Sequence, residues 1–247
     1  MSNLIEILYQ DENIVIVNKP AVMLVHRSLI DSQETIFLLQ TLRDQIGQYV
    51  YPVHRLDRPT SGIIIFALNE VSARKLKVQF DQKLVEKTYL AVVRGWLDSQ
   101  QINYPLSMNF DPIADQKANH QKLPKTAITD VFPIAKVELP FAACTRYETS
   151  RYTLVELIPH TGRKHQLRRH LKHIFHPIIG DTAYGDLRQN KAFLNHLDIK
   201  RLLLHATKLS FCHPITEEKM SFTCLPEDKE WKTIQELFKL DLKSIDK

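Results

Sequence analysis

The chain has 247 residues, 44% of them hydrophobic, and its 33 basic and 28 acidic side chains leave a formal net charge of +5. This length allows one substantial core, and the moderate basic excess suits a polyanionic partner without requiring one. Three cysteines without C-x-x-C spacing indicate neither a disulfide framework nor a thiolate zinc site. Neither a secretory signal nor a run of about eighteen apolar residues occurs, so we expect a cytoplasmic protein that does not enter membranes.

The first predicted elements are a hairpin and a packing helix. Residues 4–8 and 14–17 are short β-rich runs around a polar turn, which is typical of a hairpin. Apolar residues then recur at helical spacing over 34–45, and Gly47 lies where such a helix would end.

The segment 54–62, with the sequence HRLDRPTSG, places the carboxylate of Asp57 among basic and turn-forming residues. Pro59 and Gly62 predict a stiff, shaped loop, and the apolar run 63–67 that follows is typical of a buried strand. Taken alone, the segment is explained most simply by an ion pair between Asp57 and a neighbouring arginine.

Three further elements follow in the chain. Asn69 is a suitable N-cap for a helix that continues to about residue 80, and residues 87–95 alternate as a strand. Residues 103–150 contain five prolines and form the least regular part of the sequence. We interpret this part as a strand-and-loop excursion of the same domain, either a flap that grips the substrate or decoration.

A strand predicted over 151–157 leads into the most basic part of the chain. Thr161 is a reasonable N-cap for a helix that begins near Arg163 and carries many arginine, lysine and histidine side chains. The histidines at 165, 170, 173 and 176 lack the spacing that places two metal ligands on one helix face. The helix is therefore either a solvated surface or a binding surface for anions.

Several ordered motifs in this sequence resemble those of the pseudouridine synthases, in particular the large branch that modifies uridines in ribosomal and transfer RNA. The matching segments are Asn-Lys-Pro at 18–20 with Val25-His26, HRLDRPTSG at 54–62, Lys-x-Tyr-x-Ala-x-Val-x-Gly at 87–95, TGRKHQLRRH at 161–170 with PIIGD at 177–181 and Tyr184-Gly185, and RLLLHA at 201–206 with Leu209. One departure is Val22, where the family usually has glycine, so we expect a turn of different shape there.

The resemblance implies an α/β (α+β) fold with a mixed, mainly antiparallel central sheet flanked by helices. The expected organisation is a single catalytic domain over residues 1–240, with the active cleft across the middle of the sheet. A tail helix that contains Trp231 and Ile234 should lie back on the domain, and residues 241–247 should fray.

The family reaction breaks the bond between ribose C1′ and N1 of uracil, turns the base and rejoins it through C5. The resemblance implies that Asp57 is the nucleophile at C1′ or the base that removes a C2′ proton. It makes Arg168 the ion-pair partner of Asp57, with Arg163 as the fallback. Tyr89 would stack on the base and accept or relay the C5 proton, and Leu209 would close the apolar side of the pocket.

The target uridine must leave its RNA helix, and the resemblance implies that Arg55 fills the vacated space. Lys19, Arg163, His165 and the basic helix would contact the RNA, although Lys19 is equally well explained as a solvated turn residue. We expect no metal, no organic cofactor, no obligatory protein partner and a monomeric state.

The resemblance further implies transfer RNA as the substrate, with uridine 65 as the target. A synthase that acts on large-subunit ribosomal RNA is the alternative, which the absence of an added N-terminal RNA-binding domain disfavours slightly. From other classes, a non-catalytic RNA-binding protein and a metal-dependent nuclease remain to be tested. A pure binding protein has no need for a buried aspartate beside an arginine, and chelation would inactivate the nuclease.

Overall fold

The computed structural model describes residues 4–25, 37–107 and 123–244. The expected α/β class is confirmed, because the described chain forms a ten-stranded sheet flanked by helices. The strands are β1 (Glu6–Gln10), β2 (Ile14–Lys19), β3 (Tyr51–Pro52), β4 (Ser61–Ala67), β5 (Glu86–Arg94), β6 (Gln100–Asn103), β7 (Ile128–Leu139), β8 (Ser150–Pro159), β9 (Leu204–Cys212) and β10 (Lys219–Thr223). The helices are α1 (Leu38–Ile46), α2 (Glu70–Asp81), α3 (Gln166–His173), α4 (Leu187–Leu197), α5 (Lys229–Phe238) and the 3-10 helix η1 (Leu242–Ser244).

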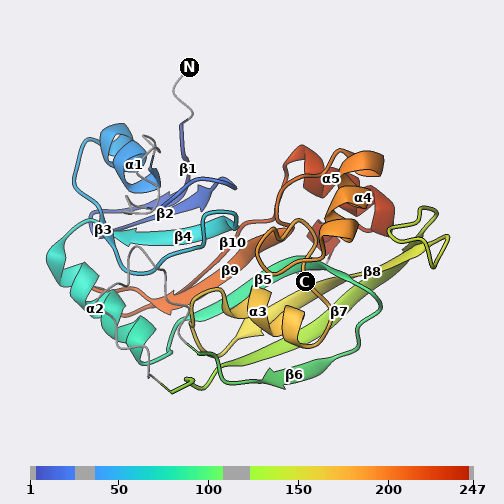
Figure 1. Cartoon of the computed structure of the whole chain (residues 1–247). Helices are drawn as coiled ribbons and strands as arrows, with labels where there is room; N and C mark the ends of the chain where they lie inside the picture. Colours follow the sequence, from blue (N-terminus) through green and yellow to red (C-terminus); the bar gives the residue numbers. More distant parts are fainter. Residues whose placement is uncertain (1–3, 26–36, 108–122, 245–247) are drawn as a thin grey trace, which may run out of the picture.

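The strand order in the sheet is β1-β2-β4-β9-β5-β8-β7-β6, with β3 paired to β4 and β10 paired to β9. Among the described strand pairs only β4 with β9 is parallel, so the mainly antiparallel sheet is also confirmed. Figure 1 shows α1 and α2 beside the half of the sheet that contains β1, β2 and β4, and α3, α4 and α5 beside the half that contains β5, β8 and β7.

Apolar side chains alternate between the two faces of the sheet, as strand geometry requires. In β2, Val15 and Val17 pack into a cluster with α1, whereas Ile14 and Ile16 pack into a cluster with α2. Toward the other end, β5 sends alternate side chains to a cluster with α3 and to a cluster with α4 and α5. Each half of the sheet is therefore covered by helices from both sides.

Most predicted elements are present. The hairpin β1–β2, the strands β4, β5 and β8, and the helices α2 and α5 lie where the sequence indicated. The side chain of Asn69 caps α2 by accepting a hydrogen bond of 2.9 Å from the backbone N–H of Ser72. The helix predicted over 34–45 is seen as α1, although residues 34–36 lie outside the described chain, as does His26.

The segment 103–150 is not decoration, because its longest element, β7, is an integral strand of the sheet, paired on both sides. Strand β7 pairs with β8 from Thr129 to Leu139 and with β6 on its other side. Pro133 lies at a register shift in the β7–β8 pairing, where a residue without a backbone N–H is tolerated. Helix α4 was not predicted.

The C-terminal helix packs on the domain through Trp231 and Ile234, both fully buried. The expected fraying after residue 240 is wrong for residues 241–244, because Leu242 is 1% exposed and belongs to the same core cluster. Whether residues 1–240 form a single folding unit stays a prediction. None of the described helices is both long and apolar enough to cross a membrane.

Val22 adopts a left-handed backbone with φ of 67°. Its side chain is exposed, so no packing compensates for the steric cost of this conformation in a β-branched residue. The turn at Val22 therefore has a backbone conformation that suits glycine. Whether its shape differs from that of the family stays a prediction.

Gly62 is where β4 and β9 approach most closely. The two strands pair only through Ser61 with His205 and Gly62 with Ala206. Gly62 has φ of 110°, and a Cβ atom at this position would lie 2.1 Å from the carbonyl oxygen of Ala206. Since this contact is with backbone, no side-chain movement can relieve it, and only glycine fits.

We expect Gly62→Ala to lower the free energy of unfolding by about 3 kcal/mol or more, because the added methyl group forces β4 and β9 apart. Gly47→Ala is the matched control: Gly47 has φ of 71°, but nothing lies within 4 Å of its virtual Cβ. The control should lose only about 1 kcal/mol through its left-handed backbone. Urea denaturation of both variants measures the difference, and equal losses would contradict the steric argument.

Candidate active site

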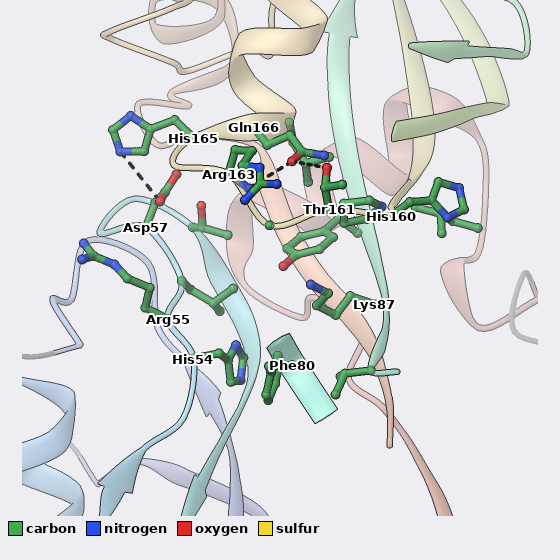
Figure 2. A pocket seen from close by; sticks show the side chains of 18 of the residues that line it. His54, Arg55, Asp57, Phe80, Lys87, His160, Thr161, Arg163, His165 and Gln166 are labelled. Atoms are coloured by element: carbon green, nitrogen blue, oxygen red, sulfur yellow. Dashed lines mark hydrogen bonds and ion pairs between the residues drawn. The ribbon is translucent and has the colours of Figure 1, made fainter. Parts of the chain in front are cut away.

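A cavity of about 900 Å³ lies where three segments meet: the loop that precedes β4, strand β5, and the loop that joins β8 to α3. Strands β4 and β8 are separated by β9 and β5, so the two loops face one another across this pair. Figure 2 shows Asp57 and Arg55 on one wall, with Thr161 and Arg163 on the opposite loop.

Asp57 lies in a tight turn at the edge of this cavity. Its carbonyl oxygen accepts a hydrogen bond of 3.0 Å from the N–H of Thr60, which closes the turn. Its carboxylate is 21% exposed and lies 3.4 Å from Nη1 of Arg168 and 3.8 Å from Nε2 of His165. The expected Asp57–Arg168 ion pair is therefore present, and the carboxylate also remains open to the cavity.

Arg168 makes its strongest pairing with Asp181. Its Nε and Nη2 donate bonds of 2.7 and 2.8 Å to the two oxygens of that carboxylate. Both side chains are almost completely buried. The hydrogen bonds from Arg168 and from two backbone N–H groups outweigh burial and lower the pKa of Asp181. The bidentate pair fixes the guanidinium and leaves its third nitrogen pointing at Asp57.

His165 holds the opposite side of the Asp57 carboxylate. Its backbone is left-handed with φ of 56°, and its Nδ1 lies 2.9 Å from the hydroxyl of Tyr184. Burial lowers the pKa of this imidazole, and the nearby Asp57 acts in the other direction. Because His165 caps α3, the strained backbone directs its ring into the site from the start of the helix.

Tyr89 lies on β5 between the two walls, where its ring contacts apolar clusters on both sides. Burial raises the pKa of its hydroxyl far above the usual value, and the negative charge of Asp57 raises it further. The phenol is therefore protonated at neutral pH, and its ring forms part of the cavity wall.

A second end of the cavity is formed by His54, Phe80 and Lys87. The rings of His54 and Phe80 are stacked with their centroids 4.5 Å apart. Nε2 of His54 accepts a hydrogen bond from the N–H of Ile65, and burial lowers the pKa of His54 to about 3. This end of the cavity thus has two neutral rings beside a lysine.

Lys19 does not contact RNA from the surface, and it is not a solvated turn residue. Its side chain is fully buried, and Nζ donates hydrogen bonds to the carbonyl oxygens of Pro20, Arg58 and Thr60. Burial and the nearby Arg201 lower the pKa of Lys19 to about 7, against the attraction of Asp57. Lys19 therefore ties strand β2 to the turn that carries Asp57.

Leu209 does not close the pocket. It is 2% exposed and packs in the core cluster with α2, while β9 contributes Leu204 to the cavity wall. Arg55 and Arg163 do line the cavity, and Arg163 donates a hydrogen bond to the carbonyl oxygen of Thr126. The apolar side of the site is therefore built from a different part of β9 than expected.

The basic helix begins later than predicted. Thr161 does not cap it; its hydroxyl instead contacts the N–H of Ile128 and the side-chain oxygen of Gln166. Helix α3 starts at Gln166 and ends at His173, so residues 161–165 form a loop that follows the cavity wall.

Asp181 and Tyr184 belong to the site, although no role was predicted for them from the sequence. Both occur in the motif around 177–185, and the apolar residues before Asp181 were a signal that its carboxylate would be buried. A buried carboxylate requires a partner, and the cation of Arg168 was available for it. The charge balance around a predicted ion pair would therefore have pointed to Asp181.

We expect Asp181→Asn to lower the free energy of unfolding at pH 7 by about 3–5 kcal/mol, because it leaves the buried guanidinium without its main carboxylate. The folded-state pKa of Asp181 is lowered, so its stabilisation is present above the unfolded pKa of about 4 and is lost as the pH falls through the folded-state value. The difference from wild type should therefore shrink on acidification.

Denaturation by urea at several values between pH 7 and pH 2 measures this dependence, because the loss falls below pH 4. Asp98→Asn is the control, because Asp98 pairs with Lys136 at the surface and its side chain is 91% exposed. The control should change stability little at any pH. A loss for Asp181→Asn that stays constant with pH would contradict the electrostatic explanation.

The sequence matches the RNA pseudouridylate synthase family over residues 13–173. It is 55% identical to tRNA pseudouridine synthase C of Pasteurella multocida over 242 residues, which cover 98% of this chain and 99% of that protein. It is 56% identical to tRNA pseudouridine synthase C of Haemophilus influenzae over 236 residues, or 95% of this chain and 98% of that protein.

Two solved structures share the fold. Human RNA pseudouridylate synthase domain containing 1 is 26% identical with a TM-score of 0.69, and the match covers 92% of this chain and 85% of that chain. Human RNA pseudouridylate synthase domain containing 4 is 23% identical with a TM-score of 0.70, over 96% and 94% of the two chains. The resemblance seen in these sequence motifs is confirmed, and the chain belongs to the RNA pseudouridylate synthase family.

Proposed function

We propose that the protein converts uridine to pseudouridine in transfer RNA, with uridine 65 as the target, and that Asp57 is its catalytic carboxylate. The observation that carries the proposal is the position of Asp57: its carboxylate faces a cavity, with Arg168 and His165 within ion-pair distance and Tyr89 on the wall. Transfer RNA is chosen because the relatives at 55% and 56% identity are named for it.

The reaction needs a carboxylate that stays ionised while water is excluded. An isolated carboxylate in such a place would be costly and would take up a proton. Arg168 offsets this cost, and Asp181 holds Arg168 in position, so the Asp57 carboxylate faces the ribose beside a fixed positive charge. Attack at C1′ and removal of a C2′ proton both use this same ionised form.

Arg55 suits the extrusion of the target nucleotide. It lies two residues before Asp57 on the cavity wall, its side chain is exposed, and within the described chain no side chain or backbone group hydrogen-bonds to it. A long cation at the mouth of the site can take the place of the flipped base, which costs a few kcal/mol to remove from its stack. We therefore assign Arg55 to this step.

Tyr89 supplies its ring to the detached uracil. Base–aromatic stacking contributes about 1–3 kcal/mol, which holds the base while it turns. The raised pKa of the hydroxyl disfavours a phenolate that accepts the C5 proton, so stacking is the role that we assign. The uracil is thereby held beside Asp57 without a charged contact.

Six cationic side chains and three carboxylates line the cavity. The cationic residues are Arg55, Lys83, Lys87, Arg163, Lys164 and Arg168. This excess of positive charge favours a polyanion and predicts that RNA affinity falls steeply with salt. We assign RNA contacts to Arg163 and the start of α3, and we propose that the enzyme works as a cytoplasmic monomer.

The decisive experiment incubates unmodified transfer RNA and ribosomal RNA transcripts separately with wild type and with Asp57→Asn, without added metal. Chemical labelling then maps pseudouridine. We expect product at one transfer-RNA site with wild type and at least about a thousandfold less with Asp57→Asn, because the group that acts on the ribose is gone.

Three other results would each contradict a different part of the proposal. Product from Asp57→Asn at the wild-type rate would refute the role of Asp57. Product only in ribosomal RNA would refute the transfer-RNA substrate but keep the chemistry. Binding of either RNA without product in wild type would refute the enzymatic function and favour a binding protein.

A second test concerns Tyr89. We expect Tyr89→Phe to keep product formation within about tenfold of wild type, because the ring and its stacking remain. Tyr89→Ala should lose more than about tenfold in single-turnover rate, because the detached base is no longer held. Loss of all product from the phenylalanine variant, with folding unchanged by circular dichroism, would show that the hydroxyl takes part in the chemistry.

A further inference from the structure

The far end of the cavity contains a cation that the proposed chemistry does not use. Lys87 lies on β5 two residues before Tyr89, and its side chain is partly buried in the cavity wall. Among the residues that the structure describes, no carboxylate or hydrogen-bond acceptor contacts its Nζ. Its one close partner is the ring of Phe80, with Nζ 5.9 Å from the ring centroid.

This arrangement leaves the charge of Lys87 poorly compensated. The cation–π contact of Lys87 with Phe80 is at the limit of contact distance and stabilises the charge only slightly. The stacked His54 is neutral, because burial lowers the pKa of His54 to about 3. Burial also lowers the pKa of Lys87 itself. The neighbouring Glu86 pairs instead with Lys219, with 3.6 Å between Nζ and Oε1.

We propose that Lys87, with the stacked pair of Phe80 and His54 behind it, is a subsite for an RNA phosphate next to the flipped nucleotide. The inference rests on the proposed function and deepens it. Figure 2 shows Lys87 directed into the cavity, apart from the wall that carries Asp57 and Arg55. Two residues along a strand span about 7 Å, so a base stacked on Tyr89 brings its own backbone within reach of Lys87.

A phosphate fits this end better than a uracil carbonyl. A carbonyl needs a single hydrogen bond from a neutral or charged donor, whereas a phosphodiester supplies the negative charge that Lys87 lacks. The cavity lining also includes Lys164 and His160, and His160 already pairs with Asp130 at 2.6 Å. Lys87 is therefore the cation best placed to receive an RNA backbone that turns into the cavity.

The test uses the Asp57→Asn background, in which RNA binds without turnover. After wild type has identified the modified uridine, a short stem-loop with that uridine is made with one methylphosphonate at a time near it. We expect one uncharged linkage to weaken binding to the parent about tenfold and to leave binding to Lys87→Met unchanged. The slope of log affinity against log salt should fall by about 1 in Lys87→Met.

Two controls distinguish the loss of phosphate binding at Lys87 from a general loss of positive charge and from a loss of folding. Lys232→Met makes the same charge change on the exposed face of α5, outside the cavity, and should respond to the methylphosphonate like the parent. Lys87→Met should be at least as stable as the parent, because it replaces a poorly compensated cation with an apolar chain of similar length.

The following results would contradict the Lys87 subsite, and they differ from those that would contradict the proposed function. Lys87 binds no phosphate if every methylphosphonate has the same effect on binding to the parent and to Lys87→Met. The same conclusion follows if all the substituted RNAs lose the same amount of affinity. A drop in melting temperature above about 5 °C in Lys87→Met would show that the ammonium is structural. If wild type forms no pseudouridine in any transcript, the proposed function fails and takes this subsite with it; product with a negative linkage test removes the subsite alone.

Discussion

The site depends on one guanidinium that serves two carboxylates. Arg168 gives two of its nitrogens to Asp181 and the third to Asp57. Only a planar side chain with several fixed donors can hold one carboxylate rigidly and still face another, so lysine could not replace it. Through this contact α3, the loop that contains Asp181 and the turn that contains Asp57 are fixed relative to one another.

The rest of the fold brings these three segments together. The brief parallel contact of β4 with β9 at Gly62 sets where the Asp57 turn leaves the sheet. Strand β8 lies two strands beyond β9 in the sheet, and the loop that follows β8 contains His165 and leads to Arg168. Lys19 reaches from β2 to the carbonyl oxygens of the same turn. Lys19 therefore holds the backbone of the turn that contains Asp57, and charged side chains across the cavity hold the Asp57 carboxylate.

Local signals were enough to predict much of this arrangement. The cap at Asn69, the special backbone at Gly62 and most strands follow from residues close in sequence, and the family motifs located the cavity. The errors at Lys19, Leu209 and Thr161 share one cause, because each depends on contacts made by distant strands. A lysine after a strand looks exposed until the carbonyl groups that surround it are known, and a leucine in a strand can face either side of the sheet.

The position of the cavity on one continuous sheet affects how this protein meets its substrate. Both walls project from strands that hydrogen-bond to one another through β9 and β5, so they do not belong to separate bodies that could swing together. The spacing between Asp57 and the opposite loop is set before any RNA arrives. Adaptation must then come chiefly from the nucleic acid, and how readily the RNA helix opens at the target would govern how fast the complex becomes productive.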